Sequence, residues 1–394
     1  MVFSLTQSVD INSYKNNNPS PPSSIYPTLS ALDANYHVSE EILRSAIFIP
    51  SAFKHGKDGK VPVLLVPGTG SYGGEAFSHN FAKLLLASSF GDPVWLNVKG
   101  RMCDASVSNA EHFAYAINYL SAVCNNKKIA VVAWSQGNLG VQWSLKYFPS
   151  TRDAVANFIC LSADFRGTVN AWGMAPFRGI PCTPSVWHQT RSSNFIMTLL
   201  SNDGDSAYVP TTSIYSRTDE IVQPQFGKWA SALMHDVRGV GVTNCEVQVA
   251  AALKPAGTVY THETLMINPL AWELASDAIC NGGPGRLDRI DMSCCMLTKA
   301  KGLNLYDVAR TQALTLTCGK AILTFLPNTI KEPTMPKYCM EEKKTYVPVD
   351  IAVIEKDAEE EGVVLKPVAP VGVVEVGKEE VPVVEANVSE GMRV

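Results

Sequence analysis

The chain of 394 residues lacks any apolar run that approaches the roughly 18 residues of a membrane-spanning helix. It also lacks an excess of basic charge, because 33 Lys and Arg residues against 37 Asp and Glu residues give a formal net charge of −4. Proteins that bind nucleic acid use a basic surface to neutralise phosphates. We therefore expect neither a transmembrane segment nor a nucleic-acid partner.

The ten cysteines are not arranged in CxxC pairs. Zinc sites and thioredoxin-type redox centres commonly use such pairs, so we expect no metal site and no redox motif. The number of cysteines favours an oxidising compartment, whereas Met1–Ser20 shows no signal peptide. The sequence therefore leaves the compartment open.

Composition divides the chain into three parts. Residues 1–35 are rich in Ser, Asn and Pro, and residues 341–394 are rich in Val, Pro and Glu. Such segments bury too little apolar surface to offset the entropy of ordering, so we expect a loose arm at 1–35. We expect a disordered or peripherally wrapped tail at 341–394. Residues 36–340 are expected to form one folded domain.

Short β-branched runs alternate with longer stretches of helical spacing in this domain. The expected strands are 61–66, 93–98, 129–133, 158–162 and 211–215, and the expected helices are 77–88 and 109–123. This alternation predicts an α/β fold, with a mostly parallel central sheet and helices on both faces. Active sites in such folds lie beyond the carboxyl ends of the strands.

Ser135 lies between an expected strand and a stretch of helical character, in the sequence Ala133-Trp134-Ser135-Gln136-Gly137. A nucleophile elbow requires this context, because its sharp turn tolerates only small residues at the flanking positions. The alternative is a serine that merely caps a helix. The strand and the small flanks favour a catalytic serine.

A catalytic serine in this fold is followed along the chain by an acid and then by a histidine. Only His188, His235 and His262 follow Ser135. His235 lies in an apparent helix, 229–235, whereas His262 follows a strand-like run and is therefore favoured as the base.

Three carboxylates are candidates for the acid. Asp219 and Glu220 follow the expected strand 211–215, and Asp164 follows the expected strand 158–162. Position in the sequence does not separate Asp164 from Asp219.

An oxyanion hole needs N–H donors from the residue after the nucleophile and from a loop after an early strand. Gln136 supplies the first donor, and the glycine-rich loop that contains Gly68 and Thr69 is the candidate for the second. The same loop matches the dinucleotide fingerprint G-x-G-x-x-G. No acidic residue ends the next expected strand, so a nicotinamide-dependent oxidoreductase is disfavoured.

Five segments share their order and their residues with one family. They are Val66–Gly70, Trp134–Gly137, Ala163–Val169, Ser185–Thr190 and Thr218–Gln225. In these segments the chain resembles the Candida antarctica lipase B family of fungi, over about residues 60 to 340. The resemblance implies an α/β-hydrolase catalytic domain at 36–340.

The resemblance also implies residue roles. The triad would be Ser135, Asp219 and His262, and the oxyanion hole would use Thr69 and Gln136. The substrate-binding positions would be Gly68, Trp134, Asp164 and Gln189. No metal or cofactor is implied. The expected substrate is a hydrophobic ester, such as triacylglycerol or a related lipid-like ester. We expect the protein to be a monomer that can act at a lipid–water interface.

The chain departs from the family beside the base, where Glu263 and Thr264 replace small residues. Cys245 and one of Cys294 or Cys295 match a family disulfide, whereas the family's N-terminal pair has no counterpart. The family is typically secreted, so this difference leaves secretion in doubt. Residues 305–326 match a mobile apolar helix over the acyl pocket, with ordinary core packing as the alternative.

We therefore expect a serine esterase or lipase of lipid metabolism that works through an acyl-enzyme. The alternative among enzymes is an acyltransferase that uses the same acyl-enzyme, and the alternative outside enzymes is a catalytically silent binding protein on the same fold.

Overall fold

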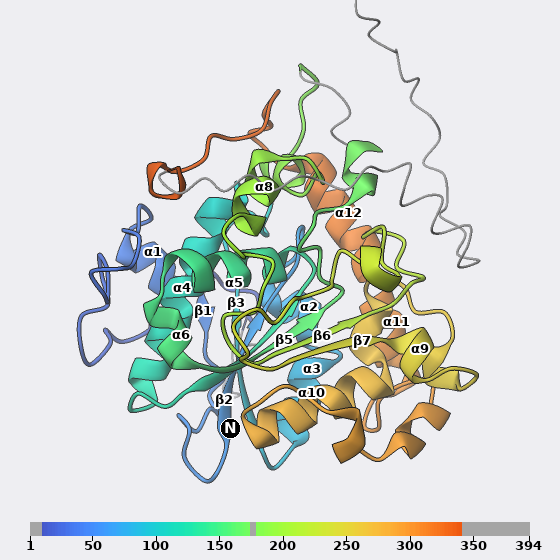
Figure 1. Cartoon of the computed structure of the whole chain (residues 1–394). Helices are drawn as coiled ribbons and strands as arrows, with labels where there is room; N and C mark the ends of the chain where they lie inside the picture. Colours follow the sequence, from blue (N-terminus) through green and yellow to red (C-terminus); the bar gives the residue numbers. More distant parts are fainter. Residues whose placement is uncertain (1–9, 174–178, 341–394) are drawn as a thin grey trace, which may run out of the picture.

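The computed structural model describes residues 10–173 and 179–340 (Figure 1). A sheet of seven strands forms its centre, in the order β1-β3-β2-β4-β5-β6-β7. Every neighbouring pair is parallel except β1 with β3. The strands are β1 (Ile47–Phe48), β2 (Val61–Val66), β3 (Gly91–Leu96), β4 (Ile129–Trp134), β5 (Val155–Leu161), β6 (Thr211–Tyr215) and β7 (Val242–Glu246).

The central strands β2 and β4 are buried on both faces, which explains why they are continuously apolar rather than alternating. In β2, Leu64 and Val66 contribute to one core cluster, whereas Val63 and Leu65 contribute to the cluster on the opposite face. Successive side chains of a strand point to opposite faces. Each central strand therefore needs helices above and below it.

Helices cover both faces of the sheet (Figure 1). One face carries α1 (Glu40–Ser45), α4 (Ser106–Val123), α5 (Gln136–Tyr147) and α6 (Ser150–Ala154), and the other carries α2 (Gly73–Phe77), α3 (Phe81–Ala87), α9 (Val247–Ala250) and α10 (Pro269–Asn281). The remaining helices are α7 (Pro184–His188), α8 (Asn194–Leu200), α11 (Leu305–Gln312) and α12 (Leu314–Thr324).

The helix α12 lies on the loop that follows β2. A Cβ atom on Gly70 would stand 2.6 Å from the carbonyl oxygen of Cys318, in the middle of α12. The Thr183 hydroxyl, next to α7, donates to the carbonyl of Ile322 at 2.7 Å. These contacts place α12 over the carboxyl ends of the strands.

The predicted mostly parallel sheet with helices on both faces is confirmed, and the strands at 61–66 and 211–215 have their predicted bounds. The single helix predicted at 77–88 is wrong, because Asn80 interrupts it. The Asn80 side chain donates to the carbonyl of Ala76 at 2.8 Å and accepts from the N–H of Phe81 at 2.6 Å, so it caps the end of α2 and the start of α3.

Two local predictions near the candidate bases are also wrong. Residues 230–235 form no helix, and residues 257–261 form no strand. Backbone contacts prevail over local propensity in the first segment, since the His235 N–H donates to the carbonyl of Asp205 at 3.0 Å. The two short edge strands, β1 and β7, were not predicted.

The loose arm predicted at 1–35 is wrong for residues 10–35, which pack on the domain. Ile25 is fully buried in the core cluster that contains α4. The Asn18 amide donates to the carbonyl of Ile47 at 2.7 Å, at the edge of the sheet. Asparagine side chains here satisfy backbone groups of the domain, which composition alone does not reveal. The tail predicted at 341–394 lies outside the described residues.

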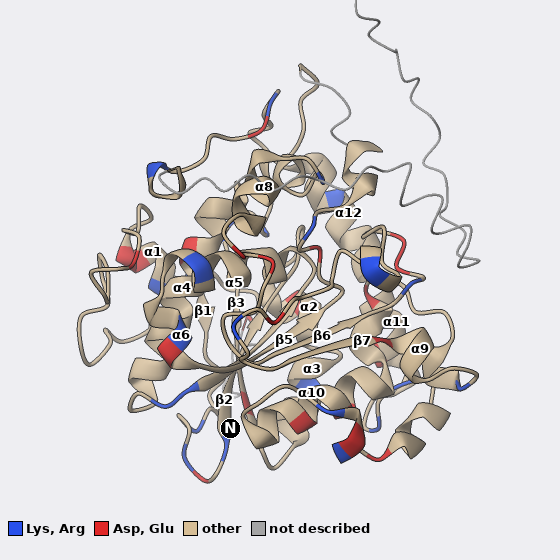
Figure 2. Ribbon diagram, in the orientation of Figure 1, with Lys and Arg blue, Asp and Glu red and all other residues tan. Residues whose placement is uncertain are grey.

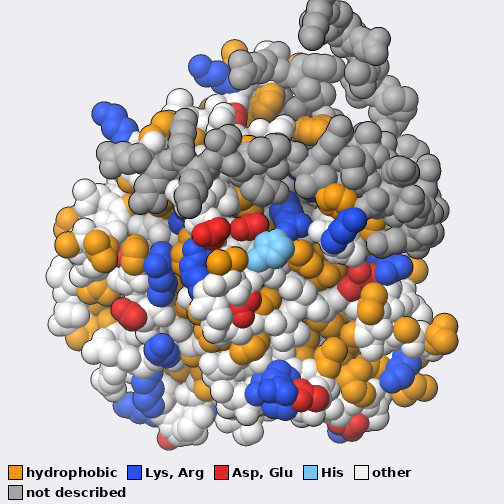
Figure 3. Space-filling view, viewed as in Figure 1, with side chains coloured by type: hydrophobic (Ala, Val, Ile, Leu, Met, Phe, Trp, Pro, Cys, Tyr) orange, Lys and Arg blue, Asp and Glu red, His pale blue; other side chains and the backbone are white. Residues whose placement is uncertain are grey.

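The charged residues are dispersed over the fold (Figure 2). On the face drawn in Figure 3, basic and acidic side chains lie among apolar ones. No helix of the described residues is long and apolar enough to span a membrane.

Candidate active site

Ser135 lies in the sharp turn between β4 and α5. Its backbone φ of 54° falls in the region that residues with a Cβ seldom adopt, which marks a strained turn. A Cβ atom on Gly137 would stand 2.7 Å from the carbonyl oxygens of Val66 and Pro67. Only glycine therefore fits at Gly137, and the turn has the geometry of a nucleophile elbow.

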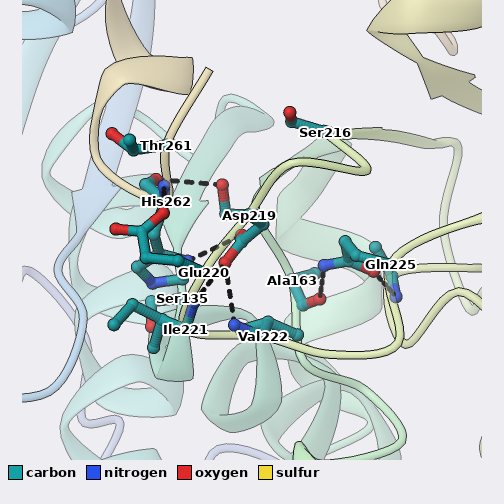
Figure 4. A network of polar contacts seen from close by, with 12 residues as sticks. Ser135, Ala163, Ser216, Asp219, Glu220, Ile221, Val222, Gln225, Thr261 and His262 are labelled. Carbon is teal, nitrogen blue, oxygen red and sulfur yellow. Dashed lines mark hydrogen bonds and ion pairs between the residues drawn. The ribbon is translucent and has the colours of Figure 1, made fainter. Parts of the chain in front are cut away.

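The side chains of Asp219 and His262 are buried at the carboxyl end of the sheet and lie at ion-pair distance from each other (Figure 4). His262 Nδ1 lies 2.8 Å from Asp219 Oδ2, and both side chains are almost completely buried. The other carboxylate oxygen of Asp219 accepts from the N–H groups of Ile221 at 2.9 Å and Val222 at 2.7 Å. Asp219 is thus fixed by its own turn and can orient the imidazole through Nδ1.

The backbone of His262 is held from three strand ends. Its carbonyl accepts from Trp134 Nε1 at 3.1 Å and from the Ser162 hydroxyl at 3.0 Å. Its N–H donates to Glu220 Oε2 at 3.0 Å. With Nδ1 directed at Asp219, Nε2 is the ring nitrogen that remains for proton transfer.

Among the described residues, no hydrogen bond joins the Ser135 hydroxyl to His262, although Figure 4 draws both residues in one network. Hydrogen bonds between a catalytic serine and its base are often long in free enzymes and shorten only in the complex with substrate.

Acidic neighbours control the protonation of His262. Burial lowers the pKa of the imidazole, but the charge and the hydrogen bond of Asp219, together with the charges of Glu263 and Glu220, raise it to about 9. The surrounding carboxylates therefore favour the imidazolium form of His262.

The loop after β2 lies directly against the serine. A Cβ atom on Gly68 would stand 2.7 Å from the Cβ of Ser135. The Gln189 amide donates to the Thr69 hydroxyl at 3.0 Å, which orients Thr69. Gln136 is buried at the start of α5, where the first N–H groups have no partner within the helix. Thr69 and Gln136 thus flank Ser135 as potential donors to an oxyanion.

Asp164 is fully buried at the end of β5, and neither of its carboxylate oxygens has a hydrogen-bond partner among the described residues. Burial raises its pKa to about 7, although the nearby His262 opposes this shift. His262 is bonded to Asp219 instead, so the geometry separates the two carboxylates that the sequence left equivalent. His235 lies outside this site and contacts Arg166 Nη2 at 3.0 Å.

Two comparisons identify the relatives of the chain. Lipase B of Pseudozyma antarctica is 40% identical over 165 residues, which are 42% of this chain and 47% of that protein. The crystal structure of Aspergillus fumigatus lipase B has 46% sequence identity and a TM-score of 0.80, over 84% of this chain and 79% of that chain.

The chain belongs to the lipase B family. This family consists of carboxylic ester hydrolases with the α/β-hydrolase fold, so the predicted fold class and enzyme class are confirmed. The match to the Pseudozyma antarctica protein spans about half of that protein's length, 47%. No protein-family model matches the chain.

Glu263 directly follows the candidate base His262. The side chain is buried, and its Oε2 has no hydrogen-bond partner among the described residues. Burial raises the pKa of this carboxyl, against the influence of His262.

The disulfide predicted between Cys245 and Cys294 or Cys295 is absent, because all ten cysteines are free thiols in the structure. Cys245 and Cys295 are buried in one apolar cluster, where burial raises the pKa of Cys245 to about 12. A thiol in such surroundings is inert and packs as a small apolar group.

Sequence reasoning missed the groups that hold the His262 backbone. Trp134 was expected only as a pocket residue, Glu220 only as a rival acid, and Ser162 was not considered. The one available signal was position, since all three residues lie at or just past strands whose carboxyl ends meet at the site.

Proposed function

We propose that the chain is a serine carboxylic-ester hydrolase that cleaves lipid-like acyl esters through the triad Ser135, Asp219 and His262. The observation that carries this proposal is the buried contact of 2.8 Å between His262 Nδ1 and Asp219 Oδ2, beside a serine in a strand–helix turn. The lipase names of two relatives support the same class.

In the first half of the reaction, the Ser135 hydroxyl attacks the ester carbonyl while His262 Nε2 takes its proton. Asp219 stabilises the imidazolium that results. The negative oxygen of the tetrahedral intermediate accepts hydrogen bonds from Gln136 and Thr69. His262 then gives the proton to the leaving alcohol, and the acyl group stays on Ser135.

In the second half, His262 takes a proton from a water molecule that attacks the acyl-enzyme. The second tetrahedral intermediate collapses, the proton returns to Ser135, and a carboxylic acid leaves. The protein groups already described perform each of these steps.

Exposed apolar side chains on α12, the helix over the carboxyl ends of the strands, support a lipid-like substrate. Leu316 and Leu323 of α12 are 79% and 75% exposed, and their spacing of seven residues places them on one face of the helix. Exposed apolar patches of this kind mark interaction sites. We propose that α12 contacts the acyl chain or the lipid surface that supplies it.

Hydrolysis of p-nitrophenyl butyrate and p-nitrophenyl palmitate by the purified protein tests this function, with Ser135→Ala as the matched variant. The proposal predicts turnover by the wild type and its loss in the variant. Equal turnover by both proteins would refute the role of Ser135, and no turnover of either ester by the wild type would refute ester hydrolysis.

A further inference from the structure

We propose that Glu220 is a positioning residue for the base. It holds the main chain of His262 while Asp219 holds the side chain, and its charge favours the imidazolium formed during the reaction. This inference rests on the proposed function, because it assigns a role within the same reaction.

The loop that carries His262 has no regular secondary structure. Residues 258–263 form neither helix nor strand, so no regular hydrogen-bond ladder fixes the position of His262. Trp134 and Ser162 both bond its carbonyl, on one side of the residue. Glu220 supplies the bond to its N–H, at 3.0 Å across 42 residues of sequence. Without Glu220, the His262 N–H would lose this partner, and the nearest anchor on that side would be Tyr260, two residues earlier, whose N–H donates to the Thr218 hydroxyl at 3.0 Å.

Glu220 itself lies on a turn that hydrogen bonds hold in place. Its carbonyl accepts from the Asn170 amide at 3.0 Å. Its neighbour Asp219 is held by the N–H groups of Ile221 and Val222. Two consecutive carboxylates on one rigid turn therefore contact the same histidine at different atoms, as the dashed lines in Figure 4 show.

Glu220 also acts on His262 through its charge. The ionisable groups that act on His262 are Asp219, Glu220, Glu263 and Asp164. Glu220 is half-buried, so its charge acts on the imidazole through a partly desolvated region. A negative charge there stabilises the imidazolium that forms when Ser135 gives up its proton, and it raises the pKa of His262 together with Asp219 and Glu263.

Two substitutions separate the two contributions of Glu220. Glu220→Ala removes both the hydrogen bond and the charge, whereas Glu220→Gln keeps an oxygen acceptor and removes only the charge. Glu41 is exposed on α1, so Glu41→Gln provides a control with the same change in charge.

We expect Glu220→Ala to lower kcat on p-nitrophenyl butyrate about 10- to 100-fold, with KM nearly unchanged, because small displacements of a catalytic group cost about this much. We expect Glu220→Gln to regain most of kcat at high pH. Its acidic limb of kcat/KM should move to lower pH, because the imidazole loses one stabilising charge. Glu41→Gln should match the wild type in kcat, in KM and in the pH profile of kcat/KM.

A wild type that hydrolyses the ester and a Glu220→Ala variant with unchanged kcat would overturn this role while leaving the proposed function intact. Equal losses in both Glu220 variants without a shift of the pH profile would also contradict it. A wild type without any hydrolysis would remove the proposed function, and this role with it.

Discussion

A Cβ atom at Gly68 would lie 2.7 Å from the Cβ of Ser135 and 3.0 Å from the indole ring of Trp134. A contact of 2.7 Å is essentially never seen for a real Cβ atom, so a residue other than glycine would displace the loop or the serine. The absence of a side chain at Gly68 therefore lets the loop after β2 approach the candidate nucleophile and direct its donors towards it.

Gly68→Ala should consequently lower kcat/KM for p-nitrophenyl butyrate by about 100-fold, because a shift of about 1 Å at a reacting centre has that effect. Gly283→Ala is the matched control, since a Cβ atom there meets nothing within 4 Å. Kinetics and a thermal melt of both variants test this prediction. Full activity in Gly68→Ala would show that the loop does not constrain Ser135.

The pH dependence of hydrolysis should reflect His262. Only the neutral imidazole accepts the proton of Ser135, and the surrounding carboxylates raise the pKa of His262 to about 9. The value of kcat/KM should therefore rise with pH across the neutral range, reach half of its maximum near pH 9 and level off about one pH unit higher. Stopped assays of the wild type, with Ser135→Ala as the blank for spontaneous hydrolysis, measure this profile. A plateau that begins near pH 6 would contradict the raised pKa.

Asp164 should make the protein less stable as pH rises. Its pKa is about 7 in the folded protein, above the ordinary value of a free aspartate near 4, so the native state binds more protons than the unfolded state between these two values. Stability therefore falls as pH rises through this range.

The variant Asp164→Asn carries no charge at any pH and should escape this loss. Its Tm should exceed that of the wild type at pH 8 by several degrees more than at pH 4.5, as differential scanning fluorimetry measures. A constant difference in Tm at both pH values would show that Asp164 does not change protonation in this range.

Leu316 and Leu323 should matter more for long acyl chains than for short ones. Both are largely exposed on α12, so replacing both with serine removes apolar contact surface at little cost to stability. We expect the ratio of palmitate to butyrate hydrolysis to fall in the double variant. Leu253→Ser, at a fully exposed leucine outside α12, is the control and should keep the ratio. An unchanged ratio in the double variant would exclude these side chains from substrate contact.

The sequence predicted the buried centre of the fold well, because β2 is a short apolar run and β6 is a short run rich in β-branched residues. It failed where tertiary contacts decide. Asn80 caps two helices from within an apparently continuous helical pattern, and Ile25 anchors an arm whose composition is that of a disordered segment. Local propensity carries no information on such distant partners.

In the candidate site, too, local features were predictable from the sequence and contacts between distant residues were not. The elbow at Ser135 was predictable, since its strand, small flanks and helix are contiguous in the sequence. The pairing of His262 with Asp219 rather than Asp164 was not predictable from position, because both acids follow parallel strands whose ends meet. In the structure, the contact with His262 and the turn at Ile221 and Val222, which fixes Asp219, distinguish the two acids.

The most direct test of the account is to label the protein with a fluorophosphonate probe and to map the modified peptide by mass spectrometry. Such probes react with serines that a neighbouring base activates. The account predicts a single adduct on Ser135, greatly slowed labelling in Asp219→Asn, and no labelling in Ser135→Ala. An unlabelled wild-type protein, or an adduct on another residue, would contradict the assignment of Ser135 as the nucleophile.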